Sequence, residues 1–264
     1  MTPTPADLAP LDPNELRQAL AAAHVRTMYQ PIVRLSDRCP VGLEVLARLF
    51  HPARGMLEPD HFVPAMERAG LGRALFEAVI GSAFDDWQRA GIGSLGVSLA
   101  VNLPLDVLIQ PDARAWLEAT RSRHAIPAAR IIIELTESQP LLGMPALAAA
   151  VAELRSHGYG LAIDDVGPDI RDHAPLLDLP FTMLKLDRAL VQSIRTGGSI
   201  DFIRAVMASA RLAGLIVVAE GVEDEATWDA MAAHGVDHVQ GFLVSRPLSA
   251  DAAVAWHEGR CIRG

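Results

Sequence analysis

The sequence has little cysteine, no long hydrophobic run and no excess of positive charge. Its two cysteines, Cys39 and Cys261, lie far apart and lack the spacing of a zinc site or a disulfide framework. The longest apolar runs, such as 212–219, are much shorter than the roughly 20 residues that span a bilayer. The N-terminus also lacks the basic start and apolar core of a secretory signal. These absences predict a soluble, cytoplasmic protein with no membrane partner.

The net charge of −9 argues against a nucleic-acid polymer as partner, because no basic stripe is present to displace counterions. A small anionic ligand stays compatible with this charge, since bound divalent metals can invert the local sign. The nine histidines are scattered and form no HExxH pattern. No G-x-G-x-x-G fingerprint follows any predicted strand, which disfavours a doubly wound dinucleotide-binding sheet.

Residues 1–24 are predicted to be an N-terminal tail followed by a short helix, and residues 25–260 to be one domain. The first 11 residues are rich in proline and are expected to be disordered. Asp12 has the features of a helix N-cap, with Pro13 at the first helical position and Glu15 completing a capping box.

Short apolar, β-branched runs alternate with Ala- and Leu-rich helical patterns along the domain. Strands are predicted at 27–35, 41–48, 95–102, 130–137, 161–165, 181–187, 215–220 and 236–242. Helices are predicted at 60–69, 74–90, 112–122, 144–157, 189–195, 200–213 and 223–234. No Gly/Ser-rich linker divides this alternation, and the length is close to the ~250 residues of a barrel. The sequence therefore predicts an α/β fold, a single (β/α)8 barrel of the TIM type.

Polar residues end successive apolar runs. The run 41–48 contains Glu44 and Arg48, and a buried carboxylate there requires a nearby cation. Later runs end in further carboxylates, an amide and one ammonium group. Because a (β/α)8 barrel places its chemistry at the C-terminal ends of its strands, we expect these side chains to meet in one site. The set is Glu44, Asn102, Glu134, Asp164, Asp165, Lys185 and Glu220.

Three carboxylates and one amide oxygen, from Glu44, Asn102, Glu134 and Asp164, form an all-oxygen donor set suited to Mg²⁺ or Mn²⁺. Asp165 and Glu220 are sufficient for a second metal that shares Asp164. Two such ions would clamp the attacking and leaving oxygens of a phosphoryl displacement. Lys185 would add positive charge beside the water or the phosphate.

Each of these residues, taken alone, also has a structural explanation. A turn would explain Asn102, and a turn or a helix cap would explain the Asp164–Asp165 pair. A helix cap would explain Glu134 and Glu220, and an exposed strand edge would explain Lys185. Taken together, however, these residues follow one another at intervals of about one βα unit, or two for the first interval. This regular order favours a shared site.

Several motifs in the same order resemble those of the EAL domain family, the bacterial phosphodiesterases that open cyclic di-GMP to linear pGpG. The signature corresponds to Glu44-Val45-Leu46-x-Arg48, with Val45 where the family has alanine. Seven further segments resemble motifs of this family and occur in the family's order, over about residues 25–260. They are Tyr29–Val33, Val101–Leu103, Glu134–Ser138, Asp164–Asp165, Leu184–Asp187, Ala219–Glu223 and Gln240–Phe242, and Ser245–Pro247 is similar to the closing motif.

The resemblance implies a role for each matching position. Glu44, Asn102, Glu134 and Asp164 would hold the first metal, and Asp164, Asp165 and Glu220 the second. Lys185 and Glu220 would orient the catalytic water, with Glu44 also in the catalytic group. Gln30, Glu44, Arg48 and Gln240 would bind cyclic di-GMP, and Glu137 would anchor a loop. The family's first strand is antiparallel to the others. Two Mg²⁺ or Mn²⁺ ions are expected, with Ca²⁺ inhibitory because it prefers more oxygens at longer distances.

One segment departs from the family. After Asp164–Asp165 the family continues Phe-Gly-Thr-Gly-Tyr-Ser-Ser-Leu, whereas residues 166–173 read Val-Gly-Pro-Asp-Ile-Arg-Asp-His. In the family this loop couples the metal site to dimerisation, so a homodimer and altered activity are both compatible with the sequence. The leading hypothesis is a metal-dependent cyclic di-GMP phosphodiesterase. The alternatives are a catalytically silent cyclic di-GMP receptor that signals through a protein partner, and an interaction module that binds neither metal nor nucleotide.

Overall fold

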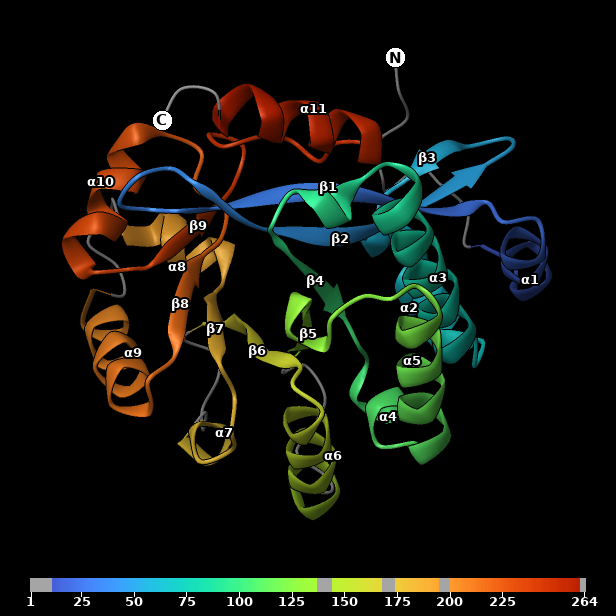
Figure 1. Ribbon diagram of the computed structural model, residues 1–264, viewed down its shortest axis with the longest axis horizontal. Coiled ribbons are helices and arrows are strands. Elements are labelled where there is room, and N and C mark those ends of the chain that lie inside the picture. The colour runs from blue at the N-terminus through green and yellow to red at the C-terminus, as the bar shows by residue number, and fades with distance from the viewer. Residues whose placement is uncertain (1–10, 137–143, 168–173, 195–199, 262–264) are drawn as a thin grey trace.

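The computed structural model describes residues 11–136, 144–167, 174–194 and 200–261 (Figure 1). The expected tail (1–10), the anchor Glu137 and most of the divergent loop (168–173) lie outside these residues. Among the described residues, no helix has both the length and the apolar character needed to cross a bilayer.

Eight strands close into a barrel, as the sequence predicts. The strand β1 pairs with β2 and with β9, so that the sheet joins on itself, and both pairings are antiparallel. All the other neighbours in the ring are parallel. The strands are β1 (Val25–Arg34), β2 (Pro40–His51), β4 (Ser98–Asn102), β5 (Ile131–Thr136), β6 (Gly160–Val166), β7 (Met183–Leu186), β8 (Ile216–Ala219) and β9 (His238–Gln240). The resemblance alone predicted the reversed first strand, and the structure confirms it.

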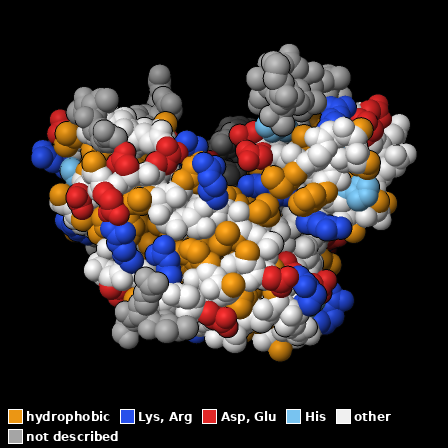
Figure 2. All heavy atoms as spheres, turned by 90° about the horizontal axis from the view of Figure 1, so that it is seen from above, with side chains coloured by type: hydrophobic (Ala, Val, Ile, Leu, Met, Phe, Trp, Pro, Cys, Tyr) orange, Lys and Arg blue, Asp and Glu red, His pale blue; other side chains and the backbone are white. Residues whose placement is uncertain are grey.

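Helices surround the barrel (Figure 1). They are α1 (Pro13–Ala21), α2 (Pro59–Arg68), α3 (Gly72–Arg89), α4 (Leu105–Leu108), α5 (Pro111–Arg123), α6 (Met144–Ser156), α7 (Ala174–Leu177), α8 (Arg188–Ser193), α9 (Ile200–Ala213), α10 (Glu225–His234) and α11 (Ala250–Cys261), with 3-10 turns η2 (Ile92–Ser94) and η3 (Ala128–Arg130). The face that carries α11 and β1 has basic, acidic and hydrophobic side chains interspersed (Figure 2).

The capping box at Asp12 forms as predicted. The Asp12 carboxylate accepts a hydrogen bond from the Asn14 N–H, and Glu15 accepts one from the Asp12 N–H. Leu16 and Ala19 of α1 are buried in a cluster separate from the main core, against α2, the start of α3 and the outer end of β2. Glu15 also lies 3.6 Å from Arg54 and from His51, which ties α1 to the turn between β2 and β3 (Gly55–Leu57).

Several predicted boundaries were wrong. The strand expected at 95–102 begins at Ser98, because Leu95 ends the turn η2 and Gly96 has a left-handed φ of 74°. The strand expected at 181–187 ends at Leu186, since the Asp187 carboxylate caps α8. The short elements β3, α4 and α7 and the C-terminal helix α11 were not predicted.

Candidate active site

The barrel interior is arranged in two layers that follow from the two-residue period of a strand. The lower layer is apolar and consists of Ile32, Ala100, Ala162, Met183 and Val218, with Ile132 packed against it. Two residues further along β4, β5, β6, β7 and β8, on the same face, come Asn102, Glu134, Asp164, Lys185 and Glu220. The apolar layer closes the barrel below, so the polar side chains gather at its C-terminal end.

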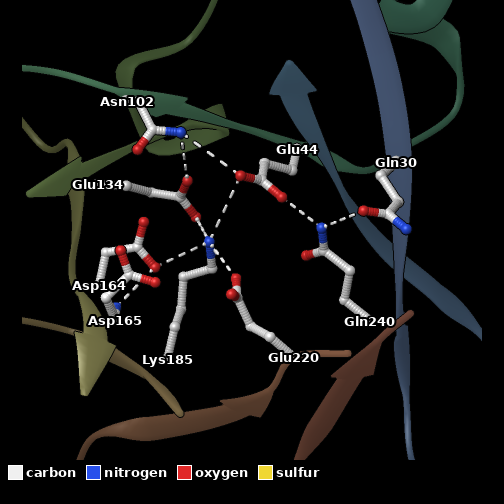
Figure 3. Close-up of polar contacts among 9 residues, drawn as sticks. All are labelled: Gln30, Glu44, Asn102, Glu134, Asp164, Asp165, Lys185, Glu220 and Gln240. Carbon is white, nitrogen blue, oxygen red and sulfur yellow. Dashed lines mark hydrogen bonds and ion pairs between the residues drawn. The ribbon is translucent and has the colours of Figure 1, made fainter. Parts of the chain in front are cut away.

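Lys185 lies at the centre of the polar layer and is fully buried (Figure 3). Its ammonium nitrogen is 2.6 Å from Glu220 Oε1, 2.9 Å from Glu134 Oε1, 3.1 Å from Asp164 Oδ1 and 3.6 Å from Glu44 Oε1. Four carboxylates from four strands therefore converge on one cation. The exposed strand edge considered for Lys185 is wrong.

Amide side chains complete the polar layer. Asn102 Nδ2 donates hydrogen bonds of 3.4 Å to Glu44 and to Glu134. Gln240 Nε2 donates to the second oxygen of Glu44 and, at 2.9 Å, to Gln30 Oε1. Every one of these contacts uses an N–H group, so Asn102 would have to turn its amide to offer its oxygen to a metal.

The position of Gln240 depends on the glycine that follows it. The Val222 N–H donates to the Gln240 carbonyl at 3.0 Å, so the backbone after β8 lies against the end of β9. A Cβ at Gly241 would collide with the backbone of Val222. The side chain of Gln30 is held by the backbone too, because its Nε2 donates a hydrogen bond of 3.1 Å to the Ser245 carbonyl. Sequence reasoning did not assign this role to Ser245, and a carbonyl contact leaves no signal in side-chain type.

A second group of carboxylates lies at the edge of the polar layer. Asp164, Asp165 and Glu220 each offer an oxygen within 4.8 Å of the others. The β6–β7 register shifts between Ile163 and Val166, and Asp165 has a left-handed φ of 57°. Its N–H donates to Asp164 Oδ1 at 3.0 Å. This irregularity places two successive acidic residues beside the same site.

The crowding of negative charge shifts several pKa values. Burial, together with Asp164 and Glu44 and against the opposing pull of Lys185, raises the pKa of Glu220 to about 8. Burial and Asp164 raise the pKa of Asp165 to about 6. Burial is also the main cause of the raised pKa of Glu134. For Lys185, burial disfavours the ammonium form, but the surrounding carboxylates outweigh it and raise its pKa.

Arg48 is buried on β2, and among the described residues it forms no hydrogen bond or ion pair with the Lys185 cluster. Its Nη1 donates to the Ala47 carbonyl at 2.8 Å, and its Nε has no hydrogen-bond partner among the described residues. Burial lowers the pKa of its guanidinium, while Glu58, Glu44 and Asp60 oppose this effect. The group stays charged, since arginine remains protonated in proteins. Arg48 therefore offers an unused donor near Glu44.

Most of the structural alternatives are excluded by this geometry. Glu134 is fully buried within β5 and caps no described helix. The helix after Glu220 is capped by Asp224 instead. Asp164 lies within β6, where it accepts the N–H of the next residue, Asp165, and contacts Lys185 of the site.

We call Glu44, Asn102, Glu134 and Asp164 the inner set, and Asp164, Asp165 and Glu220 the outer set. Both consist of hard oxygen donors of the kind that bind Mg²⁺ or Mn²⁺. The carboxylates of the inner set already surround a cation, the Lys185 ammonium group. The donor chemistry of both sets therefore fits divalent metals.

Comparison with known proteins identifies the family of this chain. The model of the EAL domain matches residues 13–247. The chain belongs to the EAL domain family. A solved structure of the MucR phosphodiesterase in complex with c-di-GMP superimposes with a TM-score of 0.85 at 30% identity, covering 91% of this chain and 98% of that one.

Two curated relatives of this EAL domain come from Pseudomonas aeruginosa. The bifunctional diguanylate cyclase/cyclic di-GMP phosphodiesterase MucR is 30% identical over 249 residues, which is 92% of this chain and 36% of MucR. The cyclic di-GMP phosphodiesterase RocR is 33% identical over 224 residues, 83% of this chain and 56% of RocR. The chain thus spans about a third to a half of these relatives.

Proposed function

We propose that this EAL domain hydrolyses cyclic di-GMP to linear pGpG in a divalent-metal-dependent reaction. The observation that carries the proposal is the convergence of Glu44, Glu134, Asp164 and Glu220 at the C-terminal end of an EAL barrel. RocR and the MucR phosphodiesterase, which this chain resembles, support the choice of substrate.

The inner set would hold one metal and the outer set another, with Asp164 shared. When bound, such ions neutralise charge on a phosphodiester and lower the pKa of water. The oxygen donors support Mg²⁺ or Mn²⁺ as the proposed ions, and the inhibition by Ca²⁺ stays a prediction. The role of Glu137 as a loop anchor also stays a prediction.

The side chains would divide the remaining work. Arg48 suits a phosphate because its planar fork can donate two parallel hydrogen bonds, and Gln30 and Gln240 would hold the rest of the dinucleotide. Glu220 and Lys185 would orient the attacking water. In the reaction the water oxygen bonds to phosphorus and one ring P–O bond breaks. The proton lost by the water would end on the leaving 3′ oxygen, so that one P–O bond and one O–H bond form as one of each breaks.

The decisive experiment is incubation of the purified protein with cyclic di-GMP and Mg²⁺ or Mn²⁺, with pGpG measured by chromatography. Turnover is expected in the wild type and its loss in Glu44→Gln, which keeps the size of the side chain and removes its charge. Arg38→Gln is the matched control, because Arg38 pairs with Glu225 on the exposed surface. Absence of pGpG with folded, metal-loaded protein would overturn the proposal.

A second function is favoured by one observation in the sequence, the replaced loop at 166–173. A catalytically silent cyclic di-GMP receptor would bind the dinucleotide, form no pGpG and signal through a protein partner. The same incubation separates the two, when dinucleotide binding is followed by calorimetry alongside pGpG. A homodimer and a cytoplasmic location remain predictions.

A further inference from the structure

Lys185 is the only lysine in the 264-residue sequence, which otherwise uses arginine where a side chain is strongly basic. On the surface the chain uses arginine to pair with carboxylates, as between Arg38 and Glu225 or Arg188 and Glu223. The single ammonium group lies where four buried carboxylates meet. A compact, near-spherical cation fits between converging oxygens, whereas a planar guanidinium would not.

The oxygens around Lys185 are those of the proposed metal sets. Its nitrogen is within 3.6 Å of the three carboxylates of the inner set, Glu44, Glu134 and Asp164. It also contacts Glu220 of the outer set at 2.6 Å, but Asp165, the most exposed member of that set, has no ion pair with it among the described contacts. The ammonium group thus contacts all three carboxylates of the inner set and two of the three carboxylates of the outer set, the shared Asp164 and Glu220.

We propose that Lys185 is a built-in counter-ion that holds the inner set together without metal and must leave its position before a divalent cation can load there. The inference rests on the proposed metal-dependent function. An ammonium group and a divalent cation cannot share the same buried oxygens, because their repulsion is strong where water is excluded. Lys185 is therefore a positioning residue that sets metal affinity, in addition to its place beside the water.

The unique lysine allows a direct test. Protein labelled with ¹³C at the lysine ε carbon gives one signal from Lys185, which can be followed while Mg²⁺ is added. We expect this signal to shift and to saturate together with metal binding measured by calorimetry. A Lys185 signal that does not change while the inner set loads would overturn the proposal.

Two variants test the competition by affinity and stability. Lys185→Met removes the charge, and Lys185→Gln removes the charge but keeps a hydrogen-bond donor. In both we expect Mn²⁺ to bind at least about tenfold more tightly, equivalent to ~1.4 kcal/mol. The melting temperature of the metal-free protein should fall by about 3 °C or more and recover when Mn²⁺ is added. Arg204→Gln, which removes one positive charge from the exposed surface, where Arg204 lies 3.8 Å from Asp201, should change neither quantity.

Unchanged or weaker Mn²⁺ binding in the folded Lys185 variants would overturn the proposal. In that case a wild type that binds Mn²⁺ and forms pGpG would leave the proposed function intact. If the wild type binds no Mn²⁺ and forms no pGpG, the proposed function fails, and the competition at Lys185 fails with it.

Discussion

At the scale of single residues, Asp164 is the carboxylate shared by the inner and outer sets. Asp164→Asn should abolish pGpG formation, because both sets lose a ligand. The metal-free protein should be as stable as the wild type or more so, since Lys185 keeps Glu44, Glu134 and Glu220 as partners and one repulsive charge is removed. Chromatographic assay and thermal melts in EDTA measure the two effects. Retention of near wild-type turnover would contradict the assignment of Asp164.

The raised pKa values of the site predict how the stability of the metal-free protein depends on pH. The pKa of Glu220 rises from 4.5 to about 8 and that of Asp165 from 3.8 to about 6. The folded protein then binds these protons more tightly than the unfolded chain, so the stabilisation is complete below about pH 4 and is lost as the pH rises to about 8. Urea unfolding in EDTA at several pH values should show this decline. Glu220→Gln should flatten the part of this decline nearest pH 8. An identical slope in the variant would argue against Glu220 as its cause.

The residue identities of the site could be predicted from sequence, but not the contacts between them. Spacing by one βα unit indicates which strand ends meet, and all seven residues of the predicted set do meet. The sequence does not show that Lys185 is central or that Asn102 presents its nitrogen. Those details depend on rotamers in a shared space, which no local pattern encodes.

At the scale of elements, the irregularity in β6 makes a prediction about backbone strain. Asp165 has φ 57°, a conformation that aspartate and asparagine adopt more readily than alanine. Asp165→Asn and Asp165→Ala remove the same charge, so their difference isolates the backbone. The Asp165→Ala variant should have a free energy of unfolding about 1 kcal/mol lower than that of Asp165→Asn, measured by urea unfolding in EDTA. Equal stabilities would mean that β6 relaxes around the substitution.

The apolar layer explains why strand prediction worked in the barrel and less well around it. Residues such as Ala100, Ala162 and Val218 alternate with outward-facing core residues, so five of the strands appear as short continuous apolar runs. Elements that depend on distant partners were not predicted. The strand β3 pairs with β2, and α11 packs against β1 and η2. The direction of β1 is likewise invisible to periodicity.

At the scale of the whole molecule, the charge balance predicts that the anionic substrate needs the metals to bind. The net charge is −9, and the site itself places five carboxylates around one lysine. Cyclic di-GMP should therefore bind at least about tenfold more weakly in EDTA than in Ca²⁺, which supplies charge but is expected not to support turnover. Calorimetric titration in the two buffers measures this ratio. Equal affinity in EDTA would favour the receptor.

The reversed direction of β1 determines where the chain enters the barrel. In a barrel of eight parallel strands the first strand starts at the end remote from the active site. Here Val25 pairs with Leu49 near the end of β2, so β1 begins at the catalytic end, and α1 lies beside the β2–β3 turn. Any domain joined ahead of α1 would have its attachment point at the end of the barrel that holds the Lys185 cluster. Through a short, rigid junction, movement of such a domain would be transmitted to β2, the strand that carries both Glu44 and Arg48.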